Sequence, residues 1–550
     1  MTDTDDIAGV DVLRGRVRFH HIGAHRAGPE RMTASARDTE PPWWRGHAPW
    51  GMACIVLLVA VVIAPMIAGY VWAPKDERFT GAPTYAEDTA QHEAWADQMA
   101  HHIWFRNVLT AEEEPRGWFI DPYDAGLGLL ERATGLGYPV VSALMTLLSA
   151  PFLAAGLMTL ARRGGIKGRN LQAGLAVLAL VSGSYAPLFM GTGFYSPTAY
   201  GDEATPVFHG QFQFLAVAVF ALVALSGESR SRDPVQPFRR AGLVLMFLGA
   251  IYPFFVPVLC MAGGLFAVVR GRVLGWRVAV RAAAWLVCLA APPMLYYAVL
   301  PHIDADYGHF ASGNYLPIMS PVTVVVNLGL GLGAYLGLKR LLAGSRAAQV
   351  IGCLAIALVV SLYAPWYPWR SHLFYLVPIL VVGAGVAWWP RLRVSSAIAR
   401  WGVVLAAIAS VASLPYYYRR SVAGVLQVRP PAYLTIGDVR AIQWLAHDHG
   451  DGVVLARSDI SPWIAAWARH RVLVGHWLWT YDYQQRVAEV DQVFAGRDPA
   501  MLIARFDVRW VLIDTNRGVP RWARTVASVK TFGTAVILRA SDIDRGGPAA

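Results

Sequence analysis

Two carboxylates follow the first long apolar run of the sequence, where they could take part in chemistry at a membrane surface. They are Glu87 and Asp88 in the segment Tyr85-Ala-Glu-Asp-Thr, and the apolar run ends at Trp72. A carboxylate in such a position can accept a proton from the hydroxyl group of a bound molecule. It can also simply be hydrated, and both interpretations stay open for each acid.

A second acidic segment lies between two later apolar runs. It extends from Tyr195 to Pro206, contains Asp202 and Glu203, and leads into His209 at the start of a predicted helix. Carboxylates and an imidazole at the mouth of a span are candidates for a substrate site, with hydration as the alternative.

Arg370 and His372 form a third candidate group, at the mouth of another apolar run. A guanidinium can hold a phosphate through two parallel hydrogen bonds, so this pair is a candidate for binding a phosphate. The alternative is an interfacial anchor, in which the side chain of Arg370 reaches out to water.

Other groups of residues indicate a catalytic or metal site less strongly. The cluster of His447, Asp448, His449 and Asp451 has metal-ligating side chains, but it stands at a predicted helix end where such residues are commonly solvated. The sequence contains no zinc-protease spacing and no nucleophile elbow. No metal site is predicted and no cofactor is firmly implied, although a divalent metal stays possible. Gly329, Gly333 and Gly337 share one face of a predicted helix and indicate close helix packing.

The elements that carry these groups are membrane spans. The chain has 550 residues, of which 55% are hydrophobic and 15% charged, which is too apolar for an ordinary soluble protein. Runs of about 17 to 25 apolar residues recur, as a hydrocarbon core requires. We expect about eleven membrane segments. The clear ones are 50–72, 138–160, 171–191, 207–226, 278–300, 321–338, 347–363, 372–389 and 401–417.

The distribution of Lys and Arg predicts the orientation, because short cytoplasmic loops retain these residues. It places the N-terminus in the cytoplasm. Arginines flank Ala241 to Val269 on both sides, and Pro253 and Pro257 interrupt it, so we expect two short helices that enter and leave on the cytoplasmic side. The C-terminal domain, from about Tyr418, then lies on the extracytoplasmic side of the membrane. These juxtamembrane arginines account for most of the net charge of +11, so nucleic acid is not an expected partner.

The sequence therefore predicts a multi-pass membrane protein with three parts. Residues 1–48 form a disordered cytoplasmic tail. Residues 49–417 form the transmembrane domain, with a long first outer loop, 73–137, that contains an amphipathic helix at the bilayer interface, a solvated acidic stretch and a second helix. Residues 418–550 form an extracytoplasmic α/β domain with strands at 453–456, 471–474, 508–513 and 534–539.

This architecture resembles the GT-C superfamily of membrane glycosyltransferases, whose members carry a catalytic acid in the first outer loop and often a second acidic site between the third and fourth spans. Glu87 and Asp88 match the first position, and Asp202 and Glu203 match the second by topology. After about residue 75 the chain also resembles a group of bacterial membrane proteins placed near that superfamily, with no assigned substrate. The segments that carry this resemblance include Thr80-Gly-Ala-Pro and Arg471-Val-Leu-Val-Gly-His-Trp-Leu-Trp-Thr480. The related sequences have an acid where this chain has Trp479.

The resemblance implies transfer of a hexose or pentose, with inversion, from a polyprenyl-phosphate-linked donor to a cell-envelope acceptor on the outer face. Asp88 is then the general base, with Glu87, Asp202 and Glu203 as further acids. Arg370, His372, His209 and Tyr85 are expected to bind substrate, and membrane lipid is the other expected partner. The alternative is a non-enzymatic transporter or scaffold whose outer domain binds envelope components. The sequence leaves the sugar, the acceptor and the oligomeric state open.

Overall fold

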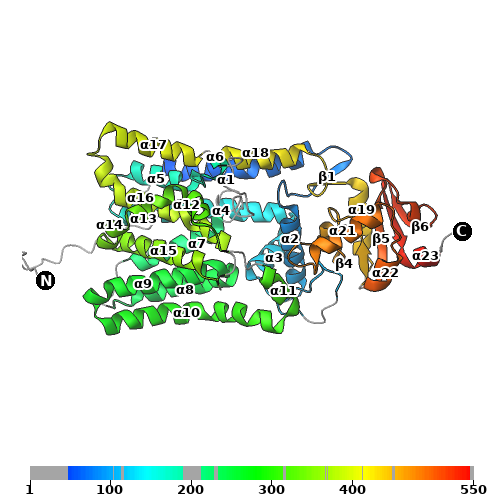
Figure 1. The fold of residues 1–550 in the computed structure, drawn as a ribbon, viewed down its shortest axis with the longest axis horizontal. Coiled ribbons are helices and arrows are strands. Elements are labelled where there is room, and N and C mark those ends of the chain that lie inside the picture. The colour runs from blue at the N-terminus through cyan, green and yellow to red at the C-terminus, as the bar shows by residue number, and fades with distance from the viewer. Residues whose placement is uncertain are drawn as a thin grey trace, which may run out of the picture. The chain divides into compact units, whose positions relative to one another are not determined.

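The computed structural model describes residues 48–102, 104–112, 117–189, 212–227, 233–313, 318–365, 367, 370–411, 413–448 and 452–545. Helices make up most of this chain up to Leu426 (Figure 1). The helices of this part, apart from those in the first outer loop, are α1 (Pro49–Trp72), α4 (Tyr138–Arg163), α5 (Arg169–Val181), α6 (Ala186–Phe189), α7 (Phe212–Ser226), α8 (Gln236–Ile251), α9 (Val256–Leu274), α10 (Trp276–Ile303), α11 (Ala305–Gly313), α12 (Pro321–Leu328), α13 (Leu332–Leu336), α14 (Leu338–Ala343), α15 (Arg346–Tyr363), α16 (Val377–Leu392), α17 (Ala397–Val411) and α18 (Ser413–Leu426).

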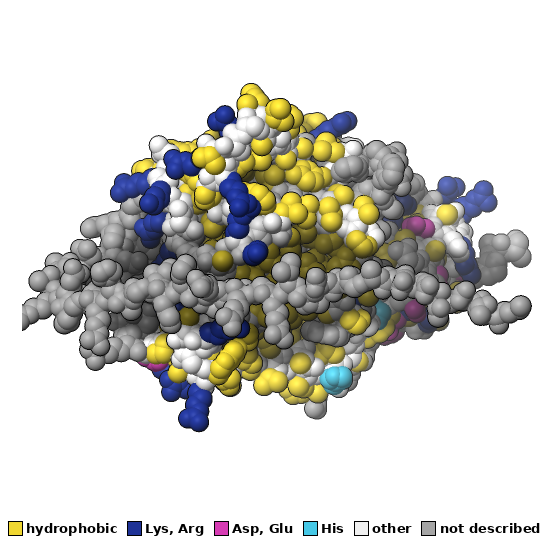
Figure 2. All heavy atoms as spheres, turned by 60° about the vertical axis from the view of Figure 1, so that its left-hand side comes forward, with side chains coloured by type: hydrophobic (Ala, Val, Ile, Leu, Met, Phe, Trp, Pro, Cys, Tyr) yellow, Lys and Arg dark blue, Asp and Glu magenta, His cyan; other side chains and the backbone are white. Residues whose placement is uncertain are grey.

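Seven helical segments in the described part of the chain are long and apolar enough to cross a membrane. A helix satisfies its own backbone hydrogen bonds, which lipid cannot do. Figure 2 shows hydrophobic side chains across the middle of one face, bordered on the left by Lys and Arg. The protein is thus a multi-pass membrane protein, and the count of about eleven segments stays a prediction. The seven are Pro49–Trp72, Tyr138–Arg163, Pro253–Leu274, Trp276–Ile303, Arg346–Tyr363, Arg370–Leu392 and Ala397–Leu426, beside shorter apolar helices at Arg169–Val181, Phe212–Ser226 and Pro321–Leu336.

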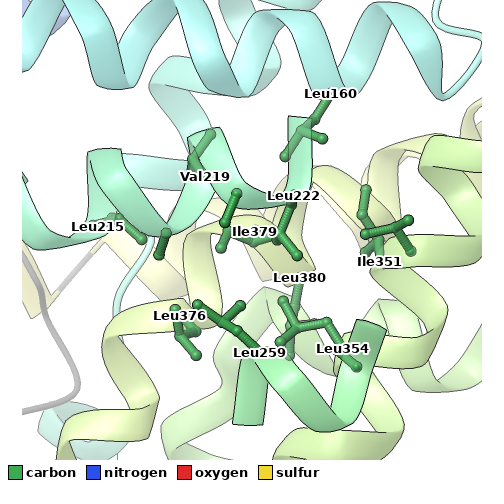
Figure 3. Packing of buried hydrophobic residues seen from close by; sticks show 14 of the residues in the cluster. Leu160, Leu215, Val219, Leu222, Leu259, Ile351, Leu354, Leu376, Ile379 and Leu380 are labelled. Atoms are coloured by element: carbon green, nitrogen blue, oxygen red, sulfur yellow. The ribbon is translucent and has the colours of Figure 1, made fainter. Parts of the chain in front are cut away.

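The transmembrane core is built from interdigitating aliphatic side chains. Leu160 of α4, Leu222 of α7 and Leu259 of α9 are fully buried, and they lie near Ile351 of α15 and Ile379 of α16 (Figure 3). In lipid such contacts stabilise through close packing rather than through the removal of apolar surface from water. Five helices distant in sequence are therefore held in one bundle.

The segment from Ala241 to Val269 is broken where its prolines predict a break. Helix α8 ends at Ile251, a 3-10 turn occupies Pro253–Phe255, and α9 begins at Val256. The prediction of two short helices is wrong for the second of them, because Pro253–Leu274 is itself 22 residues long and apolar enough to span.

The glycines of the 321–338 run serve close packing, as predicted, but they do not lie on one continuous helix. The chain leaves α12 at Gly329, which has φ of +49°, and passes through a 3-10 turn, Gly329–Gly331, before α13. A Cβ atom at Gly333 would come within 2.8 Å of the Cβ of Ala384, and one at Gly337 within 2.5 Å of that of Ala387. The absence of a side chain at both positions therefore lets α16 pack closely against this segment.

The first outer loop and the C-terminal segment are joined by backbone pairing. Strand β1 (Glu77–Phe79) pairs antiparallel with β2 (Tyr433–Thr435). Helices α2 (Ala86–His101) and α3 (Pro122–Thr134) follow β1 and lie side by side (Figure 1). The sequence predicted both helices, whereas it predicted neither β1 nor β2.

The C-terminal segment contains a five-stranded mixed sheet in the order β4-β3-β5-β7-β6. Strands β4 and β5 flank β3 in parallel, and β7 runs antiparallel to β5 and β6. Helix α19 begins with a capping box between Thr435 and Asp438, so Thr435 is its N-cap. The elements are α19 (Ile436–Ala446), β3 (Val453–Leu455), α20 (Ser461–Ala468), β4 (Arg471–Val472), α21 (Tyr483–Phe494), α22 (Ala500–Phe506), β5 (Val508–Asp514), β6 (Ser528–Phe532), β7 (Ala535–Arg539) and α23 (Ala540–Arg545), with 3-10 turns at Thr515–Arg517 and Arg521–Ala523.

Helix α2 is packed against protein along part of its surface, and its position at the bilayer interface stays a prediction. It packs against α3 and against α20 of the C-terminal segment. Trp467 Nε1 of α20 donates to Glu93 Oε1 at 3.0 Å, and Arg469 binds Asp97. The predicted solvated stretch is likewise anchored, since Arg486 Nη2 lies 2.5 Å from Glu112 Oε1. Each of these acids bonds a side chain of the C-terminal segment, which attaches the first outer loop to that segment.

The close approach at Gly333 predicts a steric effect on stability. Gly333→Leu should lower the unfolding temperature of the detergent-solubilised protein by several degrees, because overpacking costs about 1–3 kcal/mol. Gly264→Leu is the matched control, since a Cβ atom there meets nothing within 4 Å. Equal unfolding temperatures for the two variants would contradict this packing.

The buried carboxyl of Glu93 predicts a pH-dependent stability. Burial raises its pKa to about 8, and the charge of Glu131 adds to the effect. The folded protein therefore retains a proton that the unfolded chain releases above pH 4.5, so this group's stabilising contribution is present below pH 4.5 and is lost as the pH rises through about 8.

Glu93→Gln should remove this decline. Wild type and variant are expected to unfold at similar temperatures at pH 5, whereas at pH 8.5 the variant should unfold several degrees higher. Thermal unfolding followed by intrinsic tryptophan fluorescence measures the difference. Parallel curves for the two proteins across this range would show that Glu93 is already ionised in the folded state.

Candidate active site

The two acids of the first outer loop stand in the first turn of α2. Tyr85 precedes the helix in the left-handed conformation, with φ of 51°, and the guanidinium of Arg420 lies 5.3 Å from the centre of its ring. Glu87 and Asp88 follow at the helix N-terminus, where the helix dipole favours negative charge. The backbone before α2 is held by Thr80, whose hydroxyl donates to Ala432 O at 2.9 Å.

Asp88 is bonded to a histidine of the C-terminal segment. His476 Nε2 lies 2.9 Å from Asp88 Oδ1. The histidine side chain is buried, with 2% of its surface exposed, whereas the side chain of Asp88 is 45% exposed. The carboxylate is thus accessible from outside while one of its oxygen atoms is held from within the protein.

The loop that carries His476 is fixed against the first outer loop. Thr480 Oγ1 accepts the N–H groups of Gly475 and His476 at 3.0 and 3.2 Å and donates to Leu109 O. The side-chain amide of Asn107 donates to Trp479 O at 3.1 Å. Each loop is therefore held by a side chain that bonds a main-chain carbonyl of the other loop.

Glu87 is bound by a residue that follows the same loop. The hydroxyl of Tyr483 donates to Oε1 and Oε2 of Glu87 at 3.1 and 3.2 Å. Burial raises the pKa of Glu87, and the hydrogen bond from Tyr483 opposes this rise. Glu87 is thus held by Tyr483, whereas Asp88 is held by His476 and is half exposed.

A further cluster of titratable groups lies one helical turn beyond Asp88. His92 Nδ1 is 2.7 Å from Asp124 Oδ2, and the Tyr138 hydroxyl donates to Asp124 Oδ1 at 2.9 Å. Burial lowers the pKa of His92, but the charge and hydrogen bond of Asp124 outweigh it and raise the pKa to about 9. Burial also raises the pKa of Asp121, the N-cap of α3, to about 8. The sequence analysis did not single out this cluster.

Arg370 and His372 lie on a buried 3-10 turn before α16. Nε and Nη2 of Arg370 donate to Ala364 O at 3.1 and 2.9 Å, and Nη2 also donates to Pro365 O at 2.8 Å. Only 2% of Arg370 is exposed, so it is not an interfacial anchor that reaches out to water. His372 Nδ1 bonds the hydroxyl of Tyr252 at 2.5 Å.

Aromatic contacts connect this turn with the first outer loop. The ring of Tyr252 stacks on that of Phe214 at 4.4 Å, and Phe214 meets Tyr123 edge to face at 4.9 Å. Tyr123 is the neighbour of Asp124 at the start of α3, and Asp124 bonds His92. A continuous series of contacts therefore runs from the turn that carries His372 to the helix that carries Asp88.

Three predicted site residues, Asp202, Glu203 and His209, lie outside the described residues. No group of three or more His, Cys, Asp or Glu side chains that could hold a metal ion occurs in the part of the chain that the structure describes. Trp479 is buried and stacks on Phe310 at 4.4 Å within an aromatic cluster.

His476 and Tyr483 are the residues that the sequence analysis missed as site residues. The signal for His476 was present, because it stands within the segment 471–480 that carries the closest resemblance. Nothing in that segment indicates its partner, which lies 388 positions earlier.

No protein-family model and no curated protein matches the sequence. The oligosaccharyltransferase AglB of Archaeoglobus fulgidus, solved with an inhibitory peptide and a dolichol-phosphate, is similar at 11% identity, with 85% of this chain and 69% of that one covered and a TM-score of 0.48. ArnT from Cupriavidus metallidurans is similar at 12% identity, with coverages of 89% and 97% and a TM-score of 0.48. The arabinofuranosyltransferase AftD from Mycobacteria is similar at 16% identity, with 88% of this chain and 40% of that one covered and a TM-score of 0.50.

These solved proteins are GT-C glycosyltransferases. The similarity to AftD is the strongest of the three, and this chain spans less than half of that protein's length. At such low identity the similarity concerns the fold and not the chemistry. The chain described above has the fold of the GT-C glycosyltransferases.

Proposed function

We propose that the protein is a membrane glycosyltransferase that moves a sugar from a polyprenyl-phosphate donor to a cell-envelope acceptor. The observation that carries this proposal is Asp88, a half-exposed carboxylate in the first outer loop of a GT-C-like fold that a buried histidine holds in place. A general base must be accessible to the acceptor and fixed in direction, and Asp88 meets both conditions.

The proposed reaction is a single displacement. The acceptor hydroxyl oxygen attacks the anomeric carbon while the bond from that carbon to the phosphate oxygen breaks. Asp88 takes the hydroxyl proton, and the bonding electron pair leaves with polyprenyl phosphate. One displacement at the anomeric carbon inverts its configuration. Glu87, held by Tyr483, and the acids Asp202 and Glu203 of the second outer loop are assigned supporting roles.

Arg370 is the proposed cation for the leaving phosphate, with His372 beside it and His209 and Tyr85 as further substrate-binding residues. In the described structure the guanidinium of Arg370 is oriented by hydrogen bonds to the carbonyls of Ala364 and Pro365, and a guanidinium can hold a phosphate through parallel hydrogen bonds. The aromatic contacts that connect this turn to α2 support one site that includes both Arg370 and Asp88.

The proposal also includes the orientation. The C-terminal α/β domain and the first outer loop lie on the extracytoplasmic side, and residues 1–48 form a cytoplasmic tail. The contacts of α2 with α20 support one common side for the loop and the C-terminal segment. A lipid-linked donor in the outer leaflet would then present its sugar at the height of Asp88.

Asp88→Asn should lower sugar transfer by about 10²- to 10⁴-fold, because the amide cannot accept the proton. Transfer is measured in phospholipid vesicles that contain the protein and polyprenyl phosphate bearing a radiolabelled hexose or pentose. A glycan fraction from bacterial cell envelopes supplies the acceptor.

Asp97→Asn is the matched control for this test. Asp97 lies on the same helix and is bound by Arg469, away from the proposed base, so this variant should keep wild-type activity. Transfer by Asp88→Asn at the rate of the Asp97→Asn control would remove Asp88 from the mechanism. A wild-type protein that transfers neither sugar would argue for the scaffold or transporter alternative.

A further inference from the structure

The imidazole of His476 reaches the first outer loop from the opposite end of the chain. We propose that His476 is a positioning residue for Asp88, which orients one oxygen of the carboxylate and makes the C-terminal segment part of the active site. This inference rests on the glycosyl transfer proposed above.

The hydrogen bonds of the imidazole define its tautomer. The backbone N–H of Leu478 donates to His476 Nδ1 at 3.2 Å. A nitrogen that accepts a hydrogen bond carries no proton, so the proton of the neutral ring is on Nε2. Nε2–H therefore donates to Asp88 Oδ1 over the 2.9 Å between them.

The ring has little freedom to leave this position. Its side chain is buried, and the loop around it is closed by the bonds to Thr480 Oγ1. A Cβ atom at Gly475 would come within 2.5 Å of Leu109 Cα, so the loop lies directly on the backbone of residue 109. A donor fixed in this way holds Asp88 in one direction, which is the function of a group that supports a catalytic side chain.

A neutral donor suits a general base. An N–H group that donates to a carboxylate favours the ionised form and leaves its negative charge in place, so Asp88 can still accept a proton. In the described part of the chain, the charged or titratable groups near this pair include Glu87 and His92 on α2 and Tyr483 on α21. Loss of the donor should therefore move the acidic limb of the pH profile to higher pH.

Two substitutions separate the role toward Asp88 from the role within the loop. His476→Asn retains an oxygen that can accept the N–H of Leu478, but it has no atom in the place of Nε2. His476→Gln extends an amide N–H toward Asp88. We expect His476→Asn to lower kcat by about 10²-fold with little change in KM for the donor. We expect His476→Gln to recover most of that loss.

The experiment measures kcat, KM and the pH profile of both variants in the same vesicle assay, with unfolding temperatures as a check on folding. The double variant Asp88→Asn/His476→Asn should be no slower than Asp88→Asn alone, since the two residues act as one unit. Rescue by Gln, a shifted acidic limb and this non-additivity together support the inference.

Three outcomes would overturn it. If Asp88→Asn is inactive while His476→Asn keeps the wild-type kcat and pH profile, His476 has no positioning role and the proposed function stands. If the Asn and Gln variants are equally impaired and both unfold at lower temperature, the histidine serves the loop alone. If Asp88→Asn retains full activity, both the assignment of the base and the inference fail.

Discussion

The docking of the first outer loop onto the C-terminal segment fixes every acid of helix α2. Glu87, Asp88, Glu93 and Asp97 bond to Tyr483, His476, Trp467 and Arg469, respectively. The strand pair β1–β2 holds the entry to the helix, and the loop 475–480 lies on the backbone near Leu109. A carboxylate removed from water must find a donor, and here each donor comes from the same part of the chain.

This arrangement explains how the half-exposed carboxylate of Asp88 is held in one direction. The transmembrane helices are packed through aliphatic side chains and small residues, which give a rigid support but offer few polar partners. The polar partners are supplied by the C-terminal segment. The two parts thus contribute differently: the helical bundle gives rigid support, and the C-terminal segment fixes the direction of the carboxylate.

Much of the local structure follows from the sequence. The apolar run from Trp50 to Trp72 coincides with α1, and the break near Pro253 lies where proline removes a backbone donor. The strands β3, β4, β5 and β7 lie where β-branched residues cluster. These features depend on neighbouring residues, so the pattern of a short segment is sufficient to predict them. Strands β1 and β2 were not predictable in this way, because each is defined by its pairing with a partner that is distant in the sequence.

The sequence by itself determined that this chain is a membrane protein and that two acids follow its first apolar run. Length, composition and charge are properties of the linear chain and need no tertiary contact. Only the tertiary structure decided what those acids contact. It packed their helix against α3 and α20, and it bonded Asp88 to a histidine 388 positions later. Such a pair leaves no periodic signal in the sequence. It arises because the burial of apolar surface and the satisfaction of backbone groups bring distant loops together, and side-chain partners are then chosen by proximity.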